Sequence, residues 1–192
     1  MNNLNQAALD FLLTRRSRPY KTLTTPAPDK ADLLPLLTAA ARTPDHGKLE
    51  PWRFIVLTQP ALLRLSELAR TRGGELGHAD DQIDKIAAMF LTAPLSVAVI
   101  ASPKDSPKIP QMEQILSAGA ASLALLNAAL AAGWGANWLT GWTAHDRPFL
   151  TQGLDLKSHE FVAGFIHLGT QTTTPPDRPR PDLAAITTWM NT

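Results

Sequence analysis

The sequence predicts a protein of the α+β or α/β class with three layers, in which helices cover both faces of a sheet. Segments with helical periodicity alternate along the chain with short apolar segments that are typical of strands. One alanine-rich segment, residues 112–132, is long enough as a helix to cross a whole domain. With 192 residues the chain has the length of one domain of ordinary size, so we expect a single domain over residues 1–192.

Two helices and a strand are predicted in the first third of the chain. Apolar residues at helical spacing predict a helix over residues 4–16, which ends in the sequence RRS before Pro19. Asp29 is a candidate N-cap for a second helix that continues to about Arg42. The sequence RFIVL, residues 53–57, is expected to form a short strand.

The middle of the chain predicts two further helices and a buried strand. A helix over residues 59–71 begins near a proline, and the glycine-containing segment 72–81 is expected to form a flexible or lid-like loop. A short amphipathic helix over residues 81–90 follows. The almost wholly apolar segment 93–102 predicts a strand that is buried on both faces, and such a strand belongs at the centre of a sheet. Three prolines predict a loop over residues 103–111.

The last third of the chain predicts the long helix 112–132, which Gly133 ends, and two strands. Residues 135–142 are expected to form a strand with its tryptophans on one face, and residues 159–170 form a second, strongly apolar strand. The tail, 171–192, is too rich in proline to fold on itself beyond a short final turn. We therefore expect the tail to pack as an arm on another part of the assembly.

The composition excludes several functional classes. The chain has 18 basic and 17 acidic residues, a formal net charge of +1, and no basic stripe, so nucleic acid and anionic membranes are not expected as partners. The sequence contains no cysteine, which excludes disulfides, thiolate metal sites and a cysteine nucleophile. Any redox chemistry must therefore belong to a bound cofactor.

The start of the chain and the long apolar segment bear on location. The paired residues Arg15 and Arg16 come after the apolar residues of the N-terminal segment, which reverses the order found in a secretory signal. We expect a cytoplasmic protein. Glu113 and Gln114 lie in the long alanine-rich segment, which favours a buried helix over a membrane span.

Several familiar catalytic motifs are absent from the sequence. There is no HExxH, no GxSxG and no Walker motif, and GWGANW lacks the third glycine of a dinucleotide-binding fingerprint. The five histidines show no metal-ligand spacing, so we expect no metal. The chemistry therefore has to be sought in other residues.

The sequence RRS places Arg15, Arg16 and Ser17 at a predicted helix end. Two guanidinium groups and a hydroxyl suit a phosphate, which they can hold by charge-assisted hydrogen bonds. Alternatively, the arginines only complement the negative end of the helix dipole. The local sequence supports both interpretations equally.

Three other features are ambiguous when each is taken alone. Arg42 and His46 flank the turn TPD, where a histidine is more often a satisfied turn residue than a ligand. Trp52 is more often a core residue than a site residue. Three tryptophans recur every four residues from Trp134, which suits either a stacking platform or a hydrophobic layer, with the layer favoured.

The order and spacing of these motifs resemble the nitroreductase family. The pattern consists of RRS, then AARTPDHGKLEPWRFIVL, APLSVAVIA, EQILSAGAASLALLNAALAAGWGANWLTG and FIHLGT, and it extends from about residue 7 to residue 170. It is most similar to the small, minimal members related to YdjA. The resemblance implies a three-layer α/β/α fold with a mixed, mainly antiparallel sheet and a long central helix. It also implies an intertwined homodimer, in which the arm 171–192 packs on the partner subunit.

The resemblance further implies an FMN-dependent NAD(P)H oxidoreductase. One FMN is expected at each of two sites in the dimer interface, with NADPH or NADH as electron donor. Hydride would pass through flavin N5 to a small electron-poor acceptor such as a nitroaromatic, a quinone or an activated alkene. No side chain is expected to act as a catalytic nucleophile, and loops 70–82 and 102–111 are expected to set access.

The family's cofactor-binding positions can be carried over one by one. Those nearest the FMN phosphate and ribityl chain are Arg15, Arg16 and Ser17, and the partner subunit would contribute Arg42 and His46. The segment beside the phosphate and ring consists of Trp138, Leu139 and Thr140. A basic residue after LGT, Arg178 or Arg180, would also meet the phosphate, and the nicotinamide side would be lined by Ala128 and Gly133.

The sequence departs from the family pattern at several positions. Leu139 stands where we expect a basic residue in similar proteins. Pro19 stands where larger members often place a basic residue near flavin O2. Arg18 or Lys48 is a candidate for that role. Lys48 and Glu50 stand where relatives often have asparagine and glutamine, so acceptor preference is expected to differ here. The departures at Leu139 and Pro19 keep open an alternative, a flavin-binding or flavin-delivery module with little reductase activity. A binder of nucleotides or nucleic acid is disfavoured by the near-neutral charge.

Overall fold

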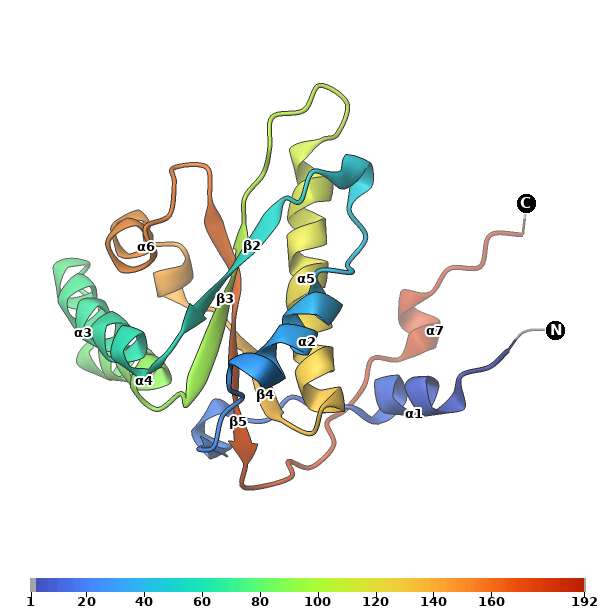
Figure 1. The fold of residues 1–192 in the computed structure, drawn as a ribbon, viewed down its shortest axis with the longest axis horizontal. Coiled ribbons are helices and arrows are strands. Elements are labelled where there is room, and N and C mark those ends of the chain that lie inside the picture. Colours follow the sequence, from blue (N-terminus) through green and yellow to red (C-terminus); the bar gives the residue numbers. More distant parts are fainter. Residues whose placement is uncertain (1–2, 192) are drawn as a thin grey trace.

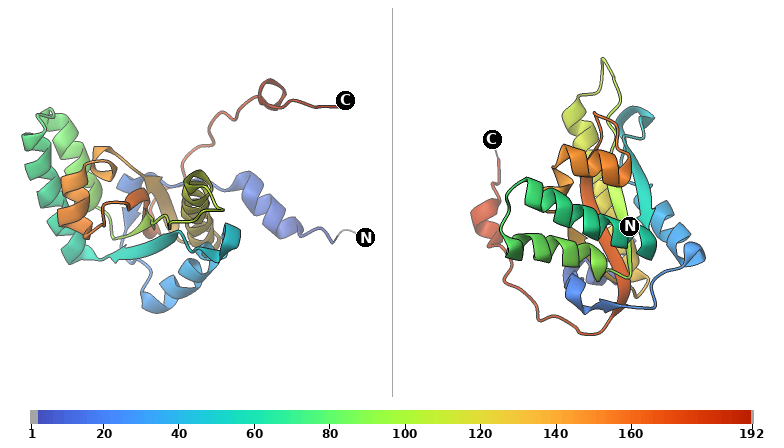
Figure 2. Two further views of the ribbon diagram at one scale, coloured as in Figure 1. Left: turned by 90° about the horizontal axis from the view of Figure 1, so that it is seen from above. Right: turned by 90° about the vertical axis from the view of Figure 1, so that its left-hand side faces the viewer.

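The computed structural model describes residues 3–191 and shows a five-stranded sheet between two layers of helices (Figures 1 and 2). The strand order is β1-β5-β3-β2, and β4 also pairs with β5. Every described strand pair is antiparallel. The strands are β1 (Leu23–Thr24), β2 (Trp52–Leu57), β3 (Leu95–Ala101), β4 (Gly135–Leu139) and β5 (Phe161–Gln171).

The central strand is β3, as the sequence predicted. All seven of its residues are buried, and it pairs with β2 on one side and with β5 on the other. Along the other edge of β5, β4 pairs with residues 165–169 and β1 with residues 170–171. An almost wholly apolar sequence is stable here because both faces of β3 are covered by helices.

One face of the sheet is covered by α2 (Lys30–Ala40) and α5 (Gln111–Ala131) (Figure 1). The carboxylate of Asp29 caps α2 by accepting the backbone N–H of Asp32 at 2.9 Å, as predicted. Within residues 3–191, α5 is the one helix long and apolar enough to cross a membrane. It packs instead along the sheet, where it buries Ala118, Ala121 and Leu125.

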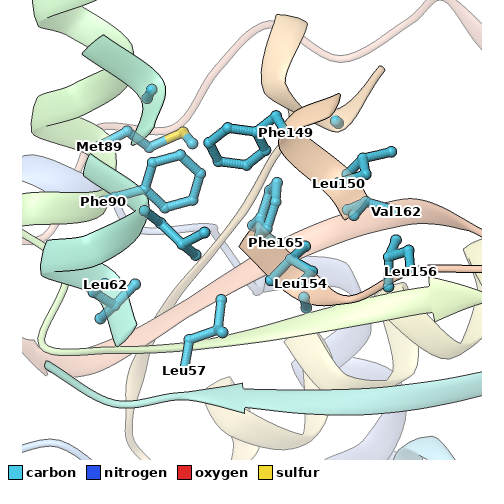
Figure 3. Close-up of a cluster of buried hydrophobic side chains, with 14 of the residues drawn as sticks. Leu57, Leu62, Met89, Phe90, Phe149, Leu150, Leu154, Leu156, Val162 and Phe165 are labelled. Atoms are coloured by element: carbon cyan, nitrogen blue, oxygen red, sulfur yellow. The ribbon is translucent and has the colours of Figure 1, made fainter. Parts of the chain in front are cut away.

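The other face is covered by α3 (Gln59–Glu75), α4 (Asp80–Leu91) and α6 (Arg147–Leu154), which enclose an aromatic core (Figure 3). Phe90 of α4 stacks on Phe149 of α6, with ring centroids 5.7 Å apart. It meets Phe165 of β5 edge-on at 5.2 Å. These contacts join the outer helices to the sheet.

The prediction of a lid-like loop over residues 72–81 is wrong for its first part. Helix α3 continues through Gly73 and Gly74 to Glu75. A Cβ atom at Gly73 would lie 2.7 Å from the side chain of Ile83, so this glycine allows α3 and α4 to pack closely. Gly73 therefore serves helix packing, whereas Gly74 has open space around it, and the connection is limited to a short turn before Asp80.

Two further differences lie after α5. Helix α6 was not predicted, although Asp146 caps it by accepting the backbone N–H of Phe149 at 3.0 Å. The strand predicted over residues 135–142 ends at Leu139, and Gly141 turns the chain with φ 153°. As a result, Trp142 packs against the aromatic core, whereas Trp134 and Trp138 pack against the α5 layer. The three tryptophans therefore do not share one face.

Both ends of the described chain project away from the layers (Figure 2). Helix α1 (Gln6–Thr14) has no buried residue, and α7 (Leu183–Ile186) lies in the projecting tail. These segments leave large apolar side chains exposed: Leu4, Leu9, Leu12, Leu13, Leu183, Ile186, Trp189 and Met190. Short 3-10 turns occur at Tyr20–Thr22, His46–Lys48 and Trp142–Ala144.

Candidate functional site

The segment after α1 is held against strand β4. Helix α1 ends at Thr14, so Arg15 is its C-cap and the rest of RRS lies beyond the helix. The backbone N–H of Arg18 donates to the carbonyl of Ala136 at 2.8 Å, and the Asn137 side chain donates to the carbonyl of Arg18. These bonds place the arginines at the junction between α1, β4 and the tail.

A pocket of about 380 Å³ lies at this junction. Six residues predicted from the sequence line it together: Arg15, Arg16, Ser17, Trp138, Arg178 and Arg180. The remaining lining residues are Leu123 and Leu126 from α5 and Pro179 and Pro181 from the tail. We call this the arginine pocket. Residues more than 150 positions apart in the sequence thus form one cationic site.

The arginines of this pocket have unused hydrogen-bonding capacity. The Nε atoms of Arg15 and Arg16 are buried and have no hydrogen-bond partner within the described residues. Arg15 donates to the Ser17 hydroxyl at 3.1 Å and Arg16 to the carbonyl of Pro176 at 3.1 Å. Neither guanidinium bonds a C-terminal carbonyl of α1, so the helix-dipole interpretation has no hydrogen bond to support it.

The pocket has an excess of positive charge. Burial, followed by the nearby charges of Arg180 and Arg16, lowers the pKa of Arg15 below its ordinary value. One carboxylate offsets this charge in part: Asp177 lies 2.8 Å from Arg180 and 3.8 Å from Arg16. An anion with several acceptor oxygens would satisfy the free donors and relieve the repulsion between the arginines.

A second cavity, of about 510 Å³, adjoins the arginine pocket and shares Arg15 and Arg16 as lining residues. Its other walls include Arg18, Gly133 and Trp134. Gly133, predicted for the nicotinamide side, is therefore close to the arginines. Ala128, predicted for the same side, is a residue of α5 that packs against the core and lines neither cavity.

Two predicted residues on the β4 segment point elsewhere in this chain. Leu139 packs against the aromatic core, and Thr140 is exposed. Neither lines the arginine pocket or the adjoining cavity. Trp138 does, and it lies flat against β5, where its Nε1 donates to the carbonyl of Ala163 at 3.2 Å. A Cβ at Gly164 would collide with the indole, so this glycine makes room for Trp138.

Arg42 and His46 do not reach the arginine pocket of their own chain. Both are exposed, and His46 Nδ1 lies 2.7 Å from the carboxylate of Glu113, at the start of α5. Glu113 is ten residues before Leu123 on α5, or about 15 Å along the helix axis. Within one chain, His46 therefore lies well away from the arginine pocket along α5.

The turn that carries His46 is fixed to α5 by hydrogen bonds. Trp52 Nε1 donates to the Ser117 hydroxyl at 3.1 Å, and that hydroxyl donates to the carbonyl of Pro44 at 2.7 Å. Within the turn, Lys48 and Glu50 have left-handed backbone conformations, with φ 55° and 49°. Non-glycine residues adopt this conformation at some cost, and such positions are common at functional sites.

Some site residues were missed from the sequence. Asp177 lies among the prolines of the tail, where nothing local indicates that it pairs with Arg16 from the other end of the chain. Leu123 and Leu126 look like ordinary helix residues. No group of three or more potential metal ligands occurs within residues 3–191.

The fold and this pocket define a protein of a recognisable class: an α+β protein with a pocket lined by four arginines. The chain belongs to the nitroreductase family, whose model matches residues 12–170. Two relatives carry the name "Putative NAD(P)H nitroreductase". YdjA of Escherichia coli K12 is 34% identical over 163 residues, which cover 85% of this chain and 87% of the relative. The Haemophilus influenzae Rd protein is 35% identical over 167 residues, which cover 85% and 88%. The chain is thus an oxidoreductase of the NAD(P)H nitroreductase type.

Solved structures show the same fold. The nitroreductase-like family protein from Bacillus cereus superposes with a TM-score of 0.77 at 22% identity, and the match covers 100% of this chain and 99% of that one. An FMN-dependent nitroreductase from Clostridium difficile R20291 gives a TM-score of 0.68 at 24% identity, with 96% and 99% covered. The resemblance seen in the sequence motifs is therefore confirmed for the family and for the nitroreductase-like fold.

Proposed function

We propose that this protein is an FMN-dependent oxidoreductase that takes hydride from NADPH or NADH and reduces a small electron-poor acceptor, such as a nitroaromatic, a quinone or an activated alkene. The observation that carries the proposal is the arginine pocket, in which the buried Nε atoms of Arg15 and Arg16 have no hydrogen-bond partner among the described residues. The NAD(P)H names of the relatives and the FMN dependence of one protein of the same fold support it.

The residues of the pocket fit a phosphate ester. A phosphate offers several acceptor oxygens, and a guanidinium can donate two parallel hydrogen bonds to it. Arg15, Arg16 and Ser17 would hold the FMN phosphate from the α1 side. Arg178 and Arg180 would close over it from the tail, because they line the same pocket.

When bound, FMN supplies the hydride-accepting and hydride-donating centre at N5. The chain's own residues then bind, orient and shield. Trp138 forms a rigid wall, since its indole is fixed to β5 through the Ala163 carbonyl. Gly133 and Trp134 border the adjoining cavity, where a nicotinamide or an acceptor could be placed beside the flavin.

We also propose that the working unit is a homodimer. Two features support it: the apolar side chains of α1 and the tail are exposed in one chain, and His46 bonds Glu113, which lies about 15 Å along α5 from Leu123 of the arginine pocket. A second copy would cover the first set. It would also bring Arg42 and His46 to the FMN held by the partner's arginine pocket.

The alternative function is an FMN-binding or flavin-delivery module with little reductase activity. Two residues favour it: Leu139 packs into the core and supplies no donor to the pocket, and Pro19 carries no basic group for the flavin. The basic residues of the tail weigh against it, because Arg178 and Arg180 replace the missing donor.

Anaerobic titration separates these functions. The purified protein is loaded with FMN and titrated with NADPH and then with NADH, while the visible absorption band of oxidised flavin is recorded. We expect one of the two nucleotides to bleach the band and a nitroaromatic or quinone to restore it. Bound FMN that neither nucleotide bleaches would establish the module, and failure to bind FMN would reject both.

A further inference from the structure

A second cationic cavity lies at the opposite end of α5 from the arginine pocket. It has a volume of about 590 Å³ and lies between the loop 102–110 and the loop that leads from α6 into β5. Figure 1 shows both loops at the same end of the molecule, in the upper part of the drawing. Gln114 lines this cavity and precedes Leu126 of the arginine pocket by twelve residues, which corresponds to about 18 Å along α5.

Three basic side chains line this cavity. Lys104 comes from the first loop, and Lys157 and His159 come from the second. None of the three forms an ion pair in the part of the chain that the structure describes. One acidic residue, Asp105, also lines the cavity, so the two lysines leave a net positive charge.

The first wall of the cavity is held rigidly from beneath. Gln114 is only 3% exposed; its side-chain oxygen accepts the backbone N–H of Lys104 at 2.8 Å, and its amide donates to the carbonyl of Lys104 at 3.0 Å. The Ser106 hydroxyl accepts the backbone N–H of Ile109 at 3.1 Å. The loop that carries Lys104 therefore has a fixed backbone.

The second wall is also fixed by buried charge. Glu160 is 2% exposed, pairs with Arg53 through two bonds of 2.8 Å and accepts the backbone N–H of Lys157 at 3.0 Å. Arg147 donates to the carbonyl of Lys157 at 3.1 Å and to that of Glu160 at 2.8 Å. Two fixed loops thus hold Lys104, Lys157 and His159 around one cavity, an arrangement that reduces the entropy lost when a ligand binds.

The basic side chains that line the cavity favour a negatively charged ligand. Ammonium groups and exposed amides favour a group with negative charge and several acceptor oxygens. Gln111, the first residue of α5, also lines the cavity, so the N-terminal end of a 21-residue helix adds a favourable partial charge. The volume falls within the range of about 300–1,000 Å³ that is usual for small organic ligands, so it exceeds what a bare ion requires.

We propose that this cavity binds the phosphoryl group of a small phosphorylated molecule of about mononucleotide size, as a site separate from the arginine pocket. Lys104 and Lys157 hold the phosphoryl oxygens, and His159 and Gln111 add donors. Within one chain this cavity shares no residue with the arginine pocket, so its binding can be measured in protein that holds no FMN. The phosphate-bearing end of the electron donor and free inorganic phosphate compounds are the two sources of such a group.

Calorimetric titration of the full chain with inorganic pyrophosphate tests the site. Lys104→Gln with Lys157→Gln should weaken binding at this site at least tenfold. The matched control is Lys108→Gln, an exposed lysine of the same loop that does not line the cavity. Arg16→Ala identifies any pyrophosphate bound in the arginine pocket. The lysines are exposed, so the double variant should fold as the wild type does, which circular dichroism checks.

The outcomes are distinct. A loss of affinity in the double variant, with Lys108→Gln and Arg16→Ala unchanged at this site, supports the proposal. Equal affinity in the double variant, or an equal loss in Lys108→Gln, overturns it, because binding would then come from the arginine pocket or from bulk charge. Parallel titrations with adenosine 2′,5′-bisphosphate identify the source: binding tighter than that of pyrophosphate, and lost in the double variant, indicates a nucleotide. A protein that binds no FMN would still give a readable result here.

Discussion

Arg15 and Arg16 show how the role of a side chain depends on residues far away in the sequence. From the sequence alone, a phosphate grip and a helix-dipole contact were equally supported. The structure places both guanidiniums beside Arg178 and Arg180 of the tail, and their Nε atoms are left without hydrogen-bond partners in the described chain. Unsatisfied buried donors are rare in native proteins, and they are a reason to expect a ligand.

We expect Arg16→Ala to weaken FMN binding by about 1.5–3 kcal/mol, the usual worth of a hydrogen bond to a charged group. Asp177→Asn should change the affinity in the opposite direction. The Asp177 carboxylate pairs with Arg16 and Arg180, so it competes with the phosphate and repels it. Fluorescence titration with FMN at fixed ionic strength measures both effects.

Arg70→Ala is the control for that comparison, because Arg70 pairs with Asp84 in the α3–α4 layer and lines neither cavity of the site. Its FMN affinity should equal that of the wild type. Unchanged affinity in Arg16→Ala, or weaker binding in Asp177→Asn, would show that the phosphate is held elsewhere.

At the scale of elements, sequence periodicity predicted most helices and strands, and the exceptions have physical causes. Glycines usually mark loops, but Gly73 lies inside α3 because α4 packs against it through Ile83. Trp142 was assigned to a strand by its spacing, whereas Gly141 turns the chain and sends the ring to the other core. In both cases a tertiary contact outweighed the local sequence pattern. Such a contact joins residues from different elements, so the local pattern does not reveal it.

Helix α7 leaves large apolar side chains exposed in the tail. Leu183 and Ile186 of α7 are 71% and 67% exposed, which is unfavourable for a tail in water unless another surface covers them. We expect the wild-type protein to sediment as a dimer. The double variant Leu183→Asp with Ile186→Asp should have a dimer dissociation constant at least tenfold higher than that of the wild type. The reason is that two charges would have to be buried at the interface.

Leu63→Asp is the matched control, since Leu63 is 49% exposed on α3, in the layer away from the tail. This variant should remain dimeric in the same sedimentation experiment. A monomeric wild type would reject the dimer, and an arm variant as dimeric as the control would place the interface elsewhere.

Across the whole molecule, the sequence motifs were enough for the family and the layered fold, but not for the full site. The arginine pocket forms only where the two ends of the chain meet beside β4, so Asp177 had no local signal. Likewise, Leu139 follows Trp138 in sequence but faces the opposite core, because successive residues of a strand alternate between faces. A motif identifies which positions matter, whereas strand direction and chain crossing decide which side chains share a cavity.

Two buried groups predict how the whole fold responds to acid. Burial lowers the pKa of His167, which bonds Ser96 at 2.9 Å, from 6.5 to about 4. The hydrogen bonds from Arg53 lower the pKa of Glu160 from 4.5 to about 2. In each case the unfolded chain takes up a proton at a higher pH than the folded chain does. Stability is therefore lost as pH falls, between about 6.5 and 4 for His167 and between about 4.5 and 2 for Glu160.

Urea unfolding followed across this pH range separates the two contributions. Glu160→Gln should flatten the part of the stability profile below about pH 4.5. In the wild type, a pKa shift of this size contributes up to roughly 3 kcal/mol to the free energy of unfolding. His167→Gln should flatten only the upper part, because an amide in the same place can bond Ser96 without taking up a proton. Both variants start from a lower stability at neutral pH, so the slope against pH is the quantity to compare. If His167→Gln kept the wild-type slope between about pH 6.5 and 4, another group would be responsible for the acid sensitivity in that window.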